Sequence, residues 1–147
     1  MNKIFFNSGV FGYSWLSNFY SVPITFEGFE YASVEHAYQA AKFAEPKTRK
    51  MFRAPMTAAG AKKLARQLRG ELRDDWSAVK VGIMTDLLRQ KFSKSDFKEK
   101  LLATGEAELI ELAPWDGFWG NGKDGKGMNV MGKILMEIRG EIMGDKK

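Results

Sequence analysis

A carboxylate and an amine share one predicted helix face near the start of the chain. Residues 33–43 read Ser-Val-Glu-His-Ala-Tyr-Gln-Ala-Ala-Lys-Phe, which places Glu35, Tyr38, Gln39 and Lys42 three or four positions apart. That spacing puts their side chains on one side of a helix, with the Cα atoms of Glu35 and Lys42 about 10 Å apart along its axis. The carboxylate can activate water or stabilise positive charge developing on a sugar carbon.

The lysine offers a second chemistry, because a desolvated amine can attack an opened sugar aldehyde. A solvated polar stripe held by a salt bridge is the alternative interpretation of the same spacing. His36 is expected to pack or hydrogen-bond beside this face rather than on it.

A second group of residues lies just before the last predicted helix. Five glycines fall within eleven residues there: Gly117, Gly120, Gly122, Gly125 and Gly127. Glycine spacing of this kind lets several N–H groups point into one concavity, and a helix N-terminus adds positive potential, so the segment predicts a phosphate site. The neighbouring Trp115, Phe118 and Trp119 predict a platform for a flat base or sugar. A flexible surface loop is the alternative.

Two familiar glycine patterns nearly match this segment, and both are excluded. Residues 120–125 fit the dinucleotide fingerprint Gly-x-Gly-x-x-Gly, but only about twenty residues follow, too few for the rest of a βαβ unit. Residues 120–126 also fit the beginning of a phosphate-binding P-loop, yet Gly127 stands where a hydroxyl side chain would hold magnesium.

Positive charge is concentrated in one part of the chain. Residues 42–73 contain ten Lys/Arg against Glu45 and Glu71, a balance of +8, whereas the whole chain carries +5, so the remainder sums to 5 − 8 = −3. Clustered cations attract phosphate-bearing or polynucleotide partners, although a solvated helix face has the same composition.

Composition excludes several classes of site. The chain has no cysteine and one histidine, so we expect no disulfide and no zinc site. Magnesium held by carboxylates is the alternative that composition leaves open. No segment approaches the roughly 20 apolar residues of a membrane span, and the first residues turn polar too early for a signal peptide. We therefore expect a cytoplasmic protein that has no membrane partner.

The apolar periodicity predicts one α+β domain over residues 1–147, mostly helical with a few short strands. Strands are expected at 3–6, 23–26 and 108–112. Ser33 is expected to cap a helix running to Glu45, and Thr57 to cap one ending at Gly70. Further helices are expected at 47–53, 76–92, from a cap at Ser95, and at 128–143.

Three motifs in this order and spacing resemble the NADAR, or YbiA-like, family. They are Leu16-Ser17-Asn18-Phe19, the helix from Ser33 to Phe43, and the segment from Trp119 to Asn129. The last motif continues through Gly132, Leu135, Met136, Ile138 and Arg139. The resemblance extends over about residues 5–142, nearly the whole chain.

The resemblance implies a mostly helical fold and an N-glycosidase that needs neither metal nor cofactor. The expected reaction is hydrolysis of the C1–N bond between a base and a phosphorylated ribose or ADP-ribose. Two substrate classes are associated with the family: ribosylated aminopyrimidines of riboflavin biosynthesis, and guanine carrying ADP-ribose in DNA. A binding module that recognises ADP-ribose or nucleic acid without turnover is the alternative.

The resemblance also implies roles for individual residues. Glu35 becomes the catalytic carboxylate and Lys42 the nucleophile that forms an imine with C1 of the sugar. Substrate-binding roles pass to Asn18, Phe19, Tyr38, Trp119, Gly120, Asn121, Gly122, Lys126, Gly127 and Asn129. Lys126 is expected to neutralise phosphate and Trp119 to stack on the base or sugar. Asn121 departs from the aspartate of many relatives, and an amide cannot take a proton.

Overall fold

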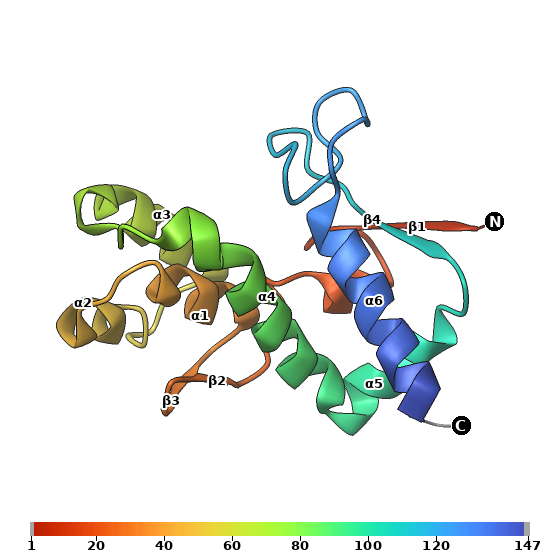
Figure 1. The fold of residues 1–147 in the computed structure, drawn as a ribbon, viewed down its shortest axis with the longest axis horizontal. Coiled ribbons are helices and arrows are strands. Elements are labelled where there is room, and N and C mark those ends of the chain that lie inside the picture. The colour runs from red at the N-terminus through yellow and green to blue at the C-terminus, as the bar shows by residue number, and fades with distance from the viewer. Residues whose placement is uncertain (1, 146–147) are drawn as a thin grey trace. The chain divides into compact units, whose positions relative to one another are not determined.

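The computed structural model describes residues 2–145, which divide into two compact units (Figure 1). One unit contains residues 18–91, and the other combines residues 2–17 with residues 92–145. The described residues form six α-helices, two short 3₁₀ turns and four strands in two two-stranded sheets. The expected α+β class, mostly helical with few short strands, is confirmed. The expectation of a single domain over residues 1–147 stays a prediction.

The unit made from both ends of the chain is built on a parallel pair of strands. Strand β1 (Lys3–Phe6) pairs with β4 (Glu108–Glu111), with Phe5 opposite Ile110. Helix α6 (Val130–Asp145) packs against β4, as Figure 1 shows, and helix α5 (Ser95–Ala103) packs against α6. A 3₁₀ turn at Ser14–Leu16 completes the unit. Its core buries Phe6, Leu101, Leu109, Met131, Leu135 and Ile138.

Close approach of α6 to β4 depends on two residues at the start of the helix. A Cβ placed on Gly132 would lie 1.9 Å from the carbonyl oxygen of Leu109, so no larger residue fits there. The buried amide of Asn129 donates to that same carbonyl at 2.9 Å and accepts from the N–H of Glu111 at 3.0 Å. Asn129 adopts φ 51°, a left-handed conformation that asparagine tolerates better than most residues.

The unit formed by residues 18–91 begins with a hairpin. Strands β2 (Ile24–Phe26) and β3 (Phe29–Tyr31) run antiparallel, with Phe26 opposite Phe29. The two connecting residues, Glu27 and Gly28, have φ of 46° and 88°. Two positive φ values are the mark of a type I′ turn, whose twist matches that of the strands.

Helices form the rest of this unit. They are α1 (Val34–Ala41), α2 (Pro46–Met51), α3 (Ala58–Gln67) and α4 (Trp76–Ser93), with a 3₁₀ turn at Arg69–Glu71. All eight residues of α1 are buried, and α2, α3 and the hairpin pack against it. Alanines at 37, 40 and 41 have no exposed surface, which lets the neighbouring elements come close.

Most expected boundaries agree with the structure, and the differences have local causes. Helix α1 ends at Ala41 instead of Glu45, because the carbonyls that follow bond to arginines rather than continuing the helix. Strand β3 was not expected, since three residues are too few to show an alternating pattern. Helix α5 is capped by Lys94 and not Ser95, and α6 begins two residues later than expected.

Gly132→Ala is expected to lower the free energy of unfolding by roughly 1–3 kcal/mol or more, because the added methyl overlaps the Leu109 carbonyl. Gly140 lies in the same helix, and a Cβ added there would meet no atom within 4 Å, so Gly140→Ala should instead stabilise by about 0.5–1 kcal/mol. Urea unfolding of both variants measures the difference. Equal effects at the two positions would contradict a packing role for Gly132.

Candidate active site

Helix α1 begins at a cap that also holds the single histidine. The Ser33 hydroxyl oxygen accepts from the N–H of His36 at 3.2 Å and lies 2.7 Å from its Nδ1. The histidine Nε2 lies 2.9 Å from the carbonyl oxygen of Met56, which can only accept. Nε2 therefore donates to Met56, and in the neutral ring Nδ1 accepts the Ser33 proton. Both nitrogens are used structurally, as the expectation of a hydrogen-bonded His36 requires.

Glu35 lies in the first turn of α1 with its side chain buried. Its Oε1 accepts a hydrogen bond of 2.8 Å from Nε2 of Gln39, one turn further along. Burial raises the pKa of Glu35 above its ordinary value, while the Gln39 hydrogen bond and the charges of Lys62 and Lys42 act in the opposite direction. A carboxyl group whose pKa moves toward neutrality is suited to exchanging protons.

The other end of the Gln39 amide is an open acceptor. Gln39 is 2% exposed, and its Oε1 has no hydrogen-bond partner among the described residues. Buried polar atoms are normally paired, so an unpaired one beside an acidic group points to a function. A ligand hydroxyl or N–H can satisfy this oxygen while the other half of the amide holds Glu35.

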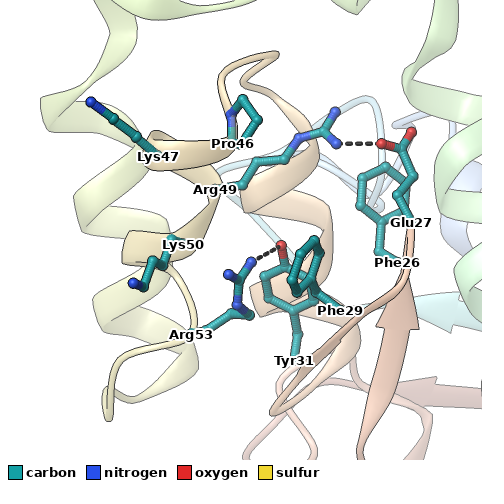
Figure 2. Close-up of a pocket in the computed structure, with 9 residues that line it drawn as sticks. All are labelled: Phe26, Glu27, Phe29, Tyr31, Pro46, Lys47, Arg49, Lys50 and Arg53. Carbon is teal, nitrogen blue, oxygen red and sulfur yellow. Dashed lines mark hydrogen bonds and ion pairs between the residues drawn. The ribbon is translucent and has the colours of Figure 1, made fainter.

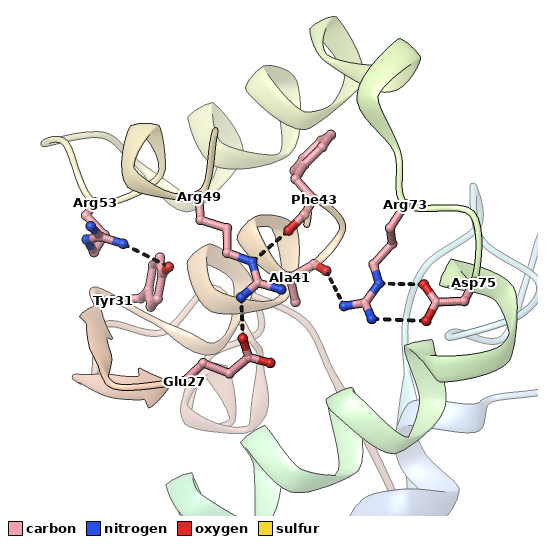
Figure 3. Close-up of polar contacts among 8 residues, drawn as sticks. All are labelled: Glu27, Tyr31, Ala41, Phe43, Arg49, Arg53, Arg73 and Asp75. Carbon is pink, nitrogen blue, oxygen red and sulfur yellow. Dashed lines mark hydrogen bonds and ion pairs between the residues drawn. The ribbon is translucent and has the colours of Figure 1, made fainter. Parts of the chain in front are cut away.

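Three consecutive carbonyls at the end of α1, those of residues 41–43, accept hydrogen bonds from arginines, which fixes the backbone around Lys42 (Figure 3). The Arg73 side chain donates to the oxygen of Ala41 at 3.3 Å, and its backbone N–H donates to the oxygen of Lys42 at 2.9 Å. Arg49 Nε donates to the oxygen of Phe43 at 2.6 Å. The last carbonyls of a helix lack partners within it, so these donors replace the missing turn.

Arg73 is itself held in place by Asp75. Its Nε and Nη2 donate to the two carboxylate oxygens of Asp75 at 2.6 and 3.1 Å, the paired geometry shown in Figure 3. These hydrogen bonds hold the pKa of Asp75 below its ordinary value. The planar guanidinium can make this pair and still reach Ala41, which a lysine could not do.

The Lys42 amine is half-buried and surrounded by more positive than negative charge. Burial lowers the pKa of Lys42, and the Glu35 carboxylate opposes this. Repulsion from three further cations lowers the pKa again: Lys62, Lys80 and Arg66. Lys62 and Arg66 belong to α3 and Lys80 to α4. A lowered pKa increases the neutral fraction of the amine, the form that acts as a nucleophile.

Aromatic rings support the Lys42 side chain. Its Nζ lies 5.6 Å from the centre of the Tyr38 ring, and that ring lies 5.1 Å from the ring of Trp76 on α4. Tyr38 is buried, so it contributes a wall and not an exposed contact. Asn18 is buried as well, and its carbonyl accepts the N–H of Glu35 at 3.1 Å. The turn motif and the helix motif are therefore adjacent at the start of α1.

The glycine-rich segment bonds chiefly to itself. The N–H groups of residues 127–131 donate to carbonyls of residues 117–121 at 2.7 to 3.1 Å. Gly122 and Gly125, with φ of 72° and 77°, turn the chain back so that these two stretches of backbone meet. The expectation that these amides and the N-terminus of α6 lie open to an anion is therefore wrong for residues 127–131.

Asparagine side chains of the segment also serve the fold. Asn121 Oδ1 accepts the N–H of Ala113 at 3.1 Å, a bond that an aspartate can accept equally well. Asn129 binds β4 through both ends of its amide. These bonds explain both residue types without a ligand, and their expected contacts with substrate stay predictions.

The aromatic and cationic residues of the segment are more accessible. Trp119 is half-buried and packs edge-on against Phe118, with ring centres 5.0 Å apart. Asp116 accepts the N–H groups of both aromatics at 2.9 Å. Lys126 is exposed, and its N–H donates to Asp124 at 2.9 Å. The expected roles of Trp119 and Lys126 at a substrate stay predictions.

The expected site residues thus fall into two groups. Asn18, Phe19, Glu35, Tyr38 and Lys42 belong to residues 18–91. A hydrogen bond joins Asn18 to Glu35, the Lys42 charge acts on Glu35, and the Lys42 amine lies over the Tyr38 ring. The others belong to residues 92–147: Trp119, Gly120, Asn121, Gly122, Lys126, Gly127 and Asn129. The expected meeting of both groups at one substrate stays a prediction.

Comparison with known proteins identifies the family. The NADAR domain model matches residues 4–143, nearly the whole chain. The chain belongs to the NADAR family. It is 36% identical to the N-glycosidase YbiA of Escherichia coli over 91% of this chain and 84% of that protein. It is 40% identical to an N-glycosidase of Nostoc punctiforme, over 88% of this chain and 86% of that protein.

Two further likenesses extend this result. The NMR structure of Escherichia coli YbiA matches with a TM-score of 0.87, covering 99% of this chain and 87% of that one. A riboflavin biosynthesis protein of Vibrio vulnificus is 39% identical over 88% of this chain but only 36% of its own length. The NADAR chain therefore spans about a third of that longer relative. The expected family, fold class and enzyme class, an N-glycosidase, are confirmed.

The sequence patterns of this NADAR protein did not identify the cations around Lys42 as site residues. Lys62 and Arg66 lie within residues 42–73, which were noted only for their overall charge, and Lys80 lies beyond that range. No spacing rule links these three residues to α1. The spacing predicts the helix face of Gln39 but no role for this residue.

No group of three or more acidic or histidine side chains suited to a metal occurs within residues 2–145, and no helix there is long and apolar enough to cross a membrane.

Glu35→Gln is expected to keep or raise the melting temperature at neutral pH. The pKa of Glu35 is higher in the folded chain, so its stabilising contribution is complete below the ordinary glutamate pKa and is lost as pH rises through the folded value. Glutamine carries no charge at any pH and retains the Gln39 contact. The stability advantage of Glu35→Gln should therefore grow between acid and neutral pH in thermal unfolding. A variant much less stable than wild type at neutral pH would contradict this.

Proposed function

We propose that the chain hydrolyses the C1–N bond between a base and a phosphorylated ribose or ADP-ribose, with Glu35 and Lys42 as its catalytic residues. The observation that supports this most is a pair of interacting groups at α1 and its C-cap: the buried Glu35 carboxyl group has a raised pKa, and the Lys42 amine has a lowered pKa. Environments that push two titratable groups in opposite directions are typical of acid–base and nucleophilic catalysis.

In the proposed reaction the neutral Lys42 amine attacks C1 of the sugar. The C1–N bond breaks, and the base leaves with the bonding electrons and takes up a proton. Opening of the sugar ring converts the C1 adduct to an imine on Nζ. Water then adds to C1 and releases the sugar, which restores the lysine, so that the net change consumes one water for each bond broken.

Glu35 has a proton-transfer and electrostatic role in this scheme. Its ionised form stabilises positive charge at C1 or takes a proton from the attacking group, and its protonated form can return a proton to the leaving base. Gln39 is proposed as its positioning residue, since one end of the amide bonds to Glu35 and the other is an open acceptor for a sugar hydroxyl. Direct attack by water assisted by Glu35 is the competing mechanism.

The phosphate is proposed to bind near the cations of α3 and α4. Lys62, Arg66 and Lys80 act electrostatically on Lys42, so a phosphate near C1 would face all three. Contributions from the second group are proposed as well, namely stacking by Trp119, neutralisation by Lys126, and polar contacts from Asn18, Asn121 and Asn129. Phe19, Tyr38, Gly120, Gly122 and Gly127 are proposed to shape the site.

Two substrate classes fit this proposal. The relative named as a riboflavin biosynthesis protein favours a small ribosylated aminopyrimidine phosphate. The +8 balance of residues 42–73 favours ADP-ribosylated guanine in DNA. Incubating the protein with each substrate and measuring released base and sugar tests the proposal. Tight binding to both without release of either would support a binding module instead.

Lys42→Ala and Lys42→Arg are both expected to reduce turnover by at least about 100-fold, because neither forms an imine. Borohydride added during turnover should leave a sugar adduct on Lys42 that is detected by peptide mass. Lys63→Ala, an exposed lysine of α3, is the matched control and should remain active. If Lys42→Ala remains active and borohydride leaves no adduct on the wild-type enzyme, Glu35-assisted attack by water is the mechanism.

Lys62→Ala is expected to raise KM for a 5′-phosphorylated substrate by about tenfold, since a charge-assisted phosphate contact is lost. KM for the same nucleoside without phosphate should change little. Lys126→Ala, measured in parallel, tests the phosphate role assigned to the glycine-rich segment. Equal effects of Lys62→Ala on substrates with and without phosphate would contradict its proposed contact.

A further inference from the structure

A pocket lies between the β2–β3 hairpin and α2, within residues 18–91 (Figure 2). Its volume is about 370 Å³, at the lower end of the roughly 300–1,000 Å³ typical of small-molecule sites. None of its lining residues belongs to the proposed catalytic site: Phe26, Glu27, Phe29, Tyr31, Pro46, Lys47, Arg49, Lys50 and Arg53. It combines an aromatic wall with a cationic one.

The aromatic wall is one face of the hairpin. Phe26 lies opposite Phe29 across the two strands, and Tyr31 follows Phe29 by two residues. Side chains opposite each other, or two apart on one strand, point to the same side of a sheet, so the three rings form a row. Tyr31 is buried, whereas Phe29 keeps 53% of its surface exposed. The row therefore ends in an accessible ring.

Arginines from α2 and the residues just after it lie over these rings. The guanidinium carbon of Arg53 lies 4.1 Å from the centre of Phe29, and Arg53 Nη1 donates to the Tyr31 hydroxyl at 3.2 Å. The guanidinium carbon of Arg49 lies 5.1 Å from the centre of Phe26. In Figure 2 both arginines extend toward the aromatic wall. Flat cations stacked on rings make a continuous surface on which another flat group can lie.

Charge in the pocket is strongly positive. Lys47, Arg49, Lys50 and Arg53 supply four positive charges, and Glu27 supplies one negative charge, for a balance of 4 − 1 = +3. Glu27 is paired with Arg49, which leaves the two lysines and Arg53 to attract an anion. Lys47 and Lys50 are exposed and point outward from α2 in Figure 2, at the rim of the pocket.

We propose that this pocket binds single-stranded nucleic acid, with a base stacked on Phe29 and Arg53 and the adjoining phosphates on Lys47 and Lys50. An exposed ring beside stacked arginines favours bases, because every base presents a flat face. Lysines outside that surface suit a backbone that continues beyond the pocket. An acidic peptide would use the charges but leave the aromatic surface uncovered.

The inference goes beyond the proposed N-glycosidase function and does not depend on it, since the strand bound need carry no modification. Should the catalytic substrate be ADP-ribosylated DNA, the pocket would hold nucleotides that flank the modified base. A small ribosylated substrate does not need this pocket, and the two functions can therefore be measured separately.

The test is binding of a fluorescein-labelled oligothymidylate, followed by fluorescence anisotropy over a series of salt concentrations. Wild type is expected to bind, with log affinity falling linearly against log salt. Phe29→Ala should weaken binding about tenfold or more, and Phe29→Tyr should restore it because tyrosine also stacks. The control is Phe11→Ala, which removes a phenylalanine that is 99% exposed and lies outside the pocket.

A charge-matched pair of double variants tests the lysines. Lys47→Ala with Lys50→Ala should reduce the magnitude of the salt slope by about 1 to 1.5, the loss of two phosphate contacts on a single strand. Lys94→Ala with Lys133→Ala removes the same charge from exposed positions on the other unit and should leave the slope nearly unchanged. Melting temperatures and hydrolysis of a small ribosylated substrate serve as controls for folding and for the catalytic site.

Three results would overturn the proposal. The first is a wild-type protein that does not bind the oligonucleotide at low salt. The second is an equal loss of binding in the two double variants, which would reflect net charge alone. The third is full competition by poly-glutamate at matched charge, which would make the pocket a site for acidic peptides. Loss of hydrolysis in Glu35→Gln with oligonucleotide binding intact would support the catalytic role of Glu35 and would agree with a separate nucleic-acid pocket.

Discussion

The buried carboxyl group of Glu35 is the constraint around which the first turns of the helical unit are arranged. A carboxylate removed from water is unfavourable unless hydrogen bonds and opposite charge compensate it. Gln39 supplies the hydrogen bond from one turn along α1, and Lys42 and Lys62 supply the charge. Lys62 also repels the charged Lys42 amine, so the cation that stabilises the Glu35 carboxylate also lowers the pKa of Lys42.

This mutual dependence explains why the end of α1 is so firmly held. The Lys42 side chain can interact with Glu35 only if the backbone at the end of the helix keeps its position. Arg73 and Arg49 hold the carbonyls of residues 41–43, and Asp75 in turn holds Arg73. Part of the positive charge in residues 42–73 therefore has a structural role, because the side chains of Arg49, Arg69 and Arg73 donate to backbone carbonyls.

The sequence allowed much of this to be predicted, for physical reasons that differ from place to place. Ser33 and Thr57 each accept an N–H of the first turn of their helix, as local capping rules predict. Periodicity correctly placed Glu35 within α1, and Lys42 follows as its C-cap, one residue beyond the last helical position. The early end of α1 could not be predicted, because it depends on Arg73, which is 31 positions beyond Lys42 in the chain.

The glycine-rich segment shows the limit of local patterns more clearly. Its spacing predicts amides open to an anion, yet those of residues 127–131 bond to the carbonyls of residues 117–121. Gly132 and Asn129 were recognised through the family resemblance, whereas their physical role, a close fit of α6 on β4, depends on a strand some twenty residues earlier. Pattern alone cannot distinguish a glycine that binds a ligand from one that allows two elements to touch.

Self-pairing of this segment has an entropic consequence. A loop of five glycines would lose a great deal of conformational freedom if a ligand had to order it, and that loss would weaken binding. Here the backbone hydrogen bonds between residues 117–121 and 127–131 impose the order during folding. Any molecule that contacts Trp119 or Lys126 therefore meets a preorganised surface, and the cost of ordering the loop falls on the stability of the protein instead of on the affinity for the ligand.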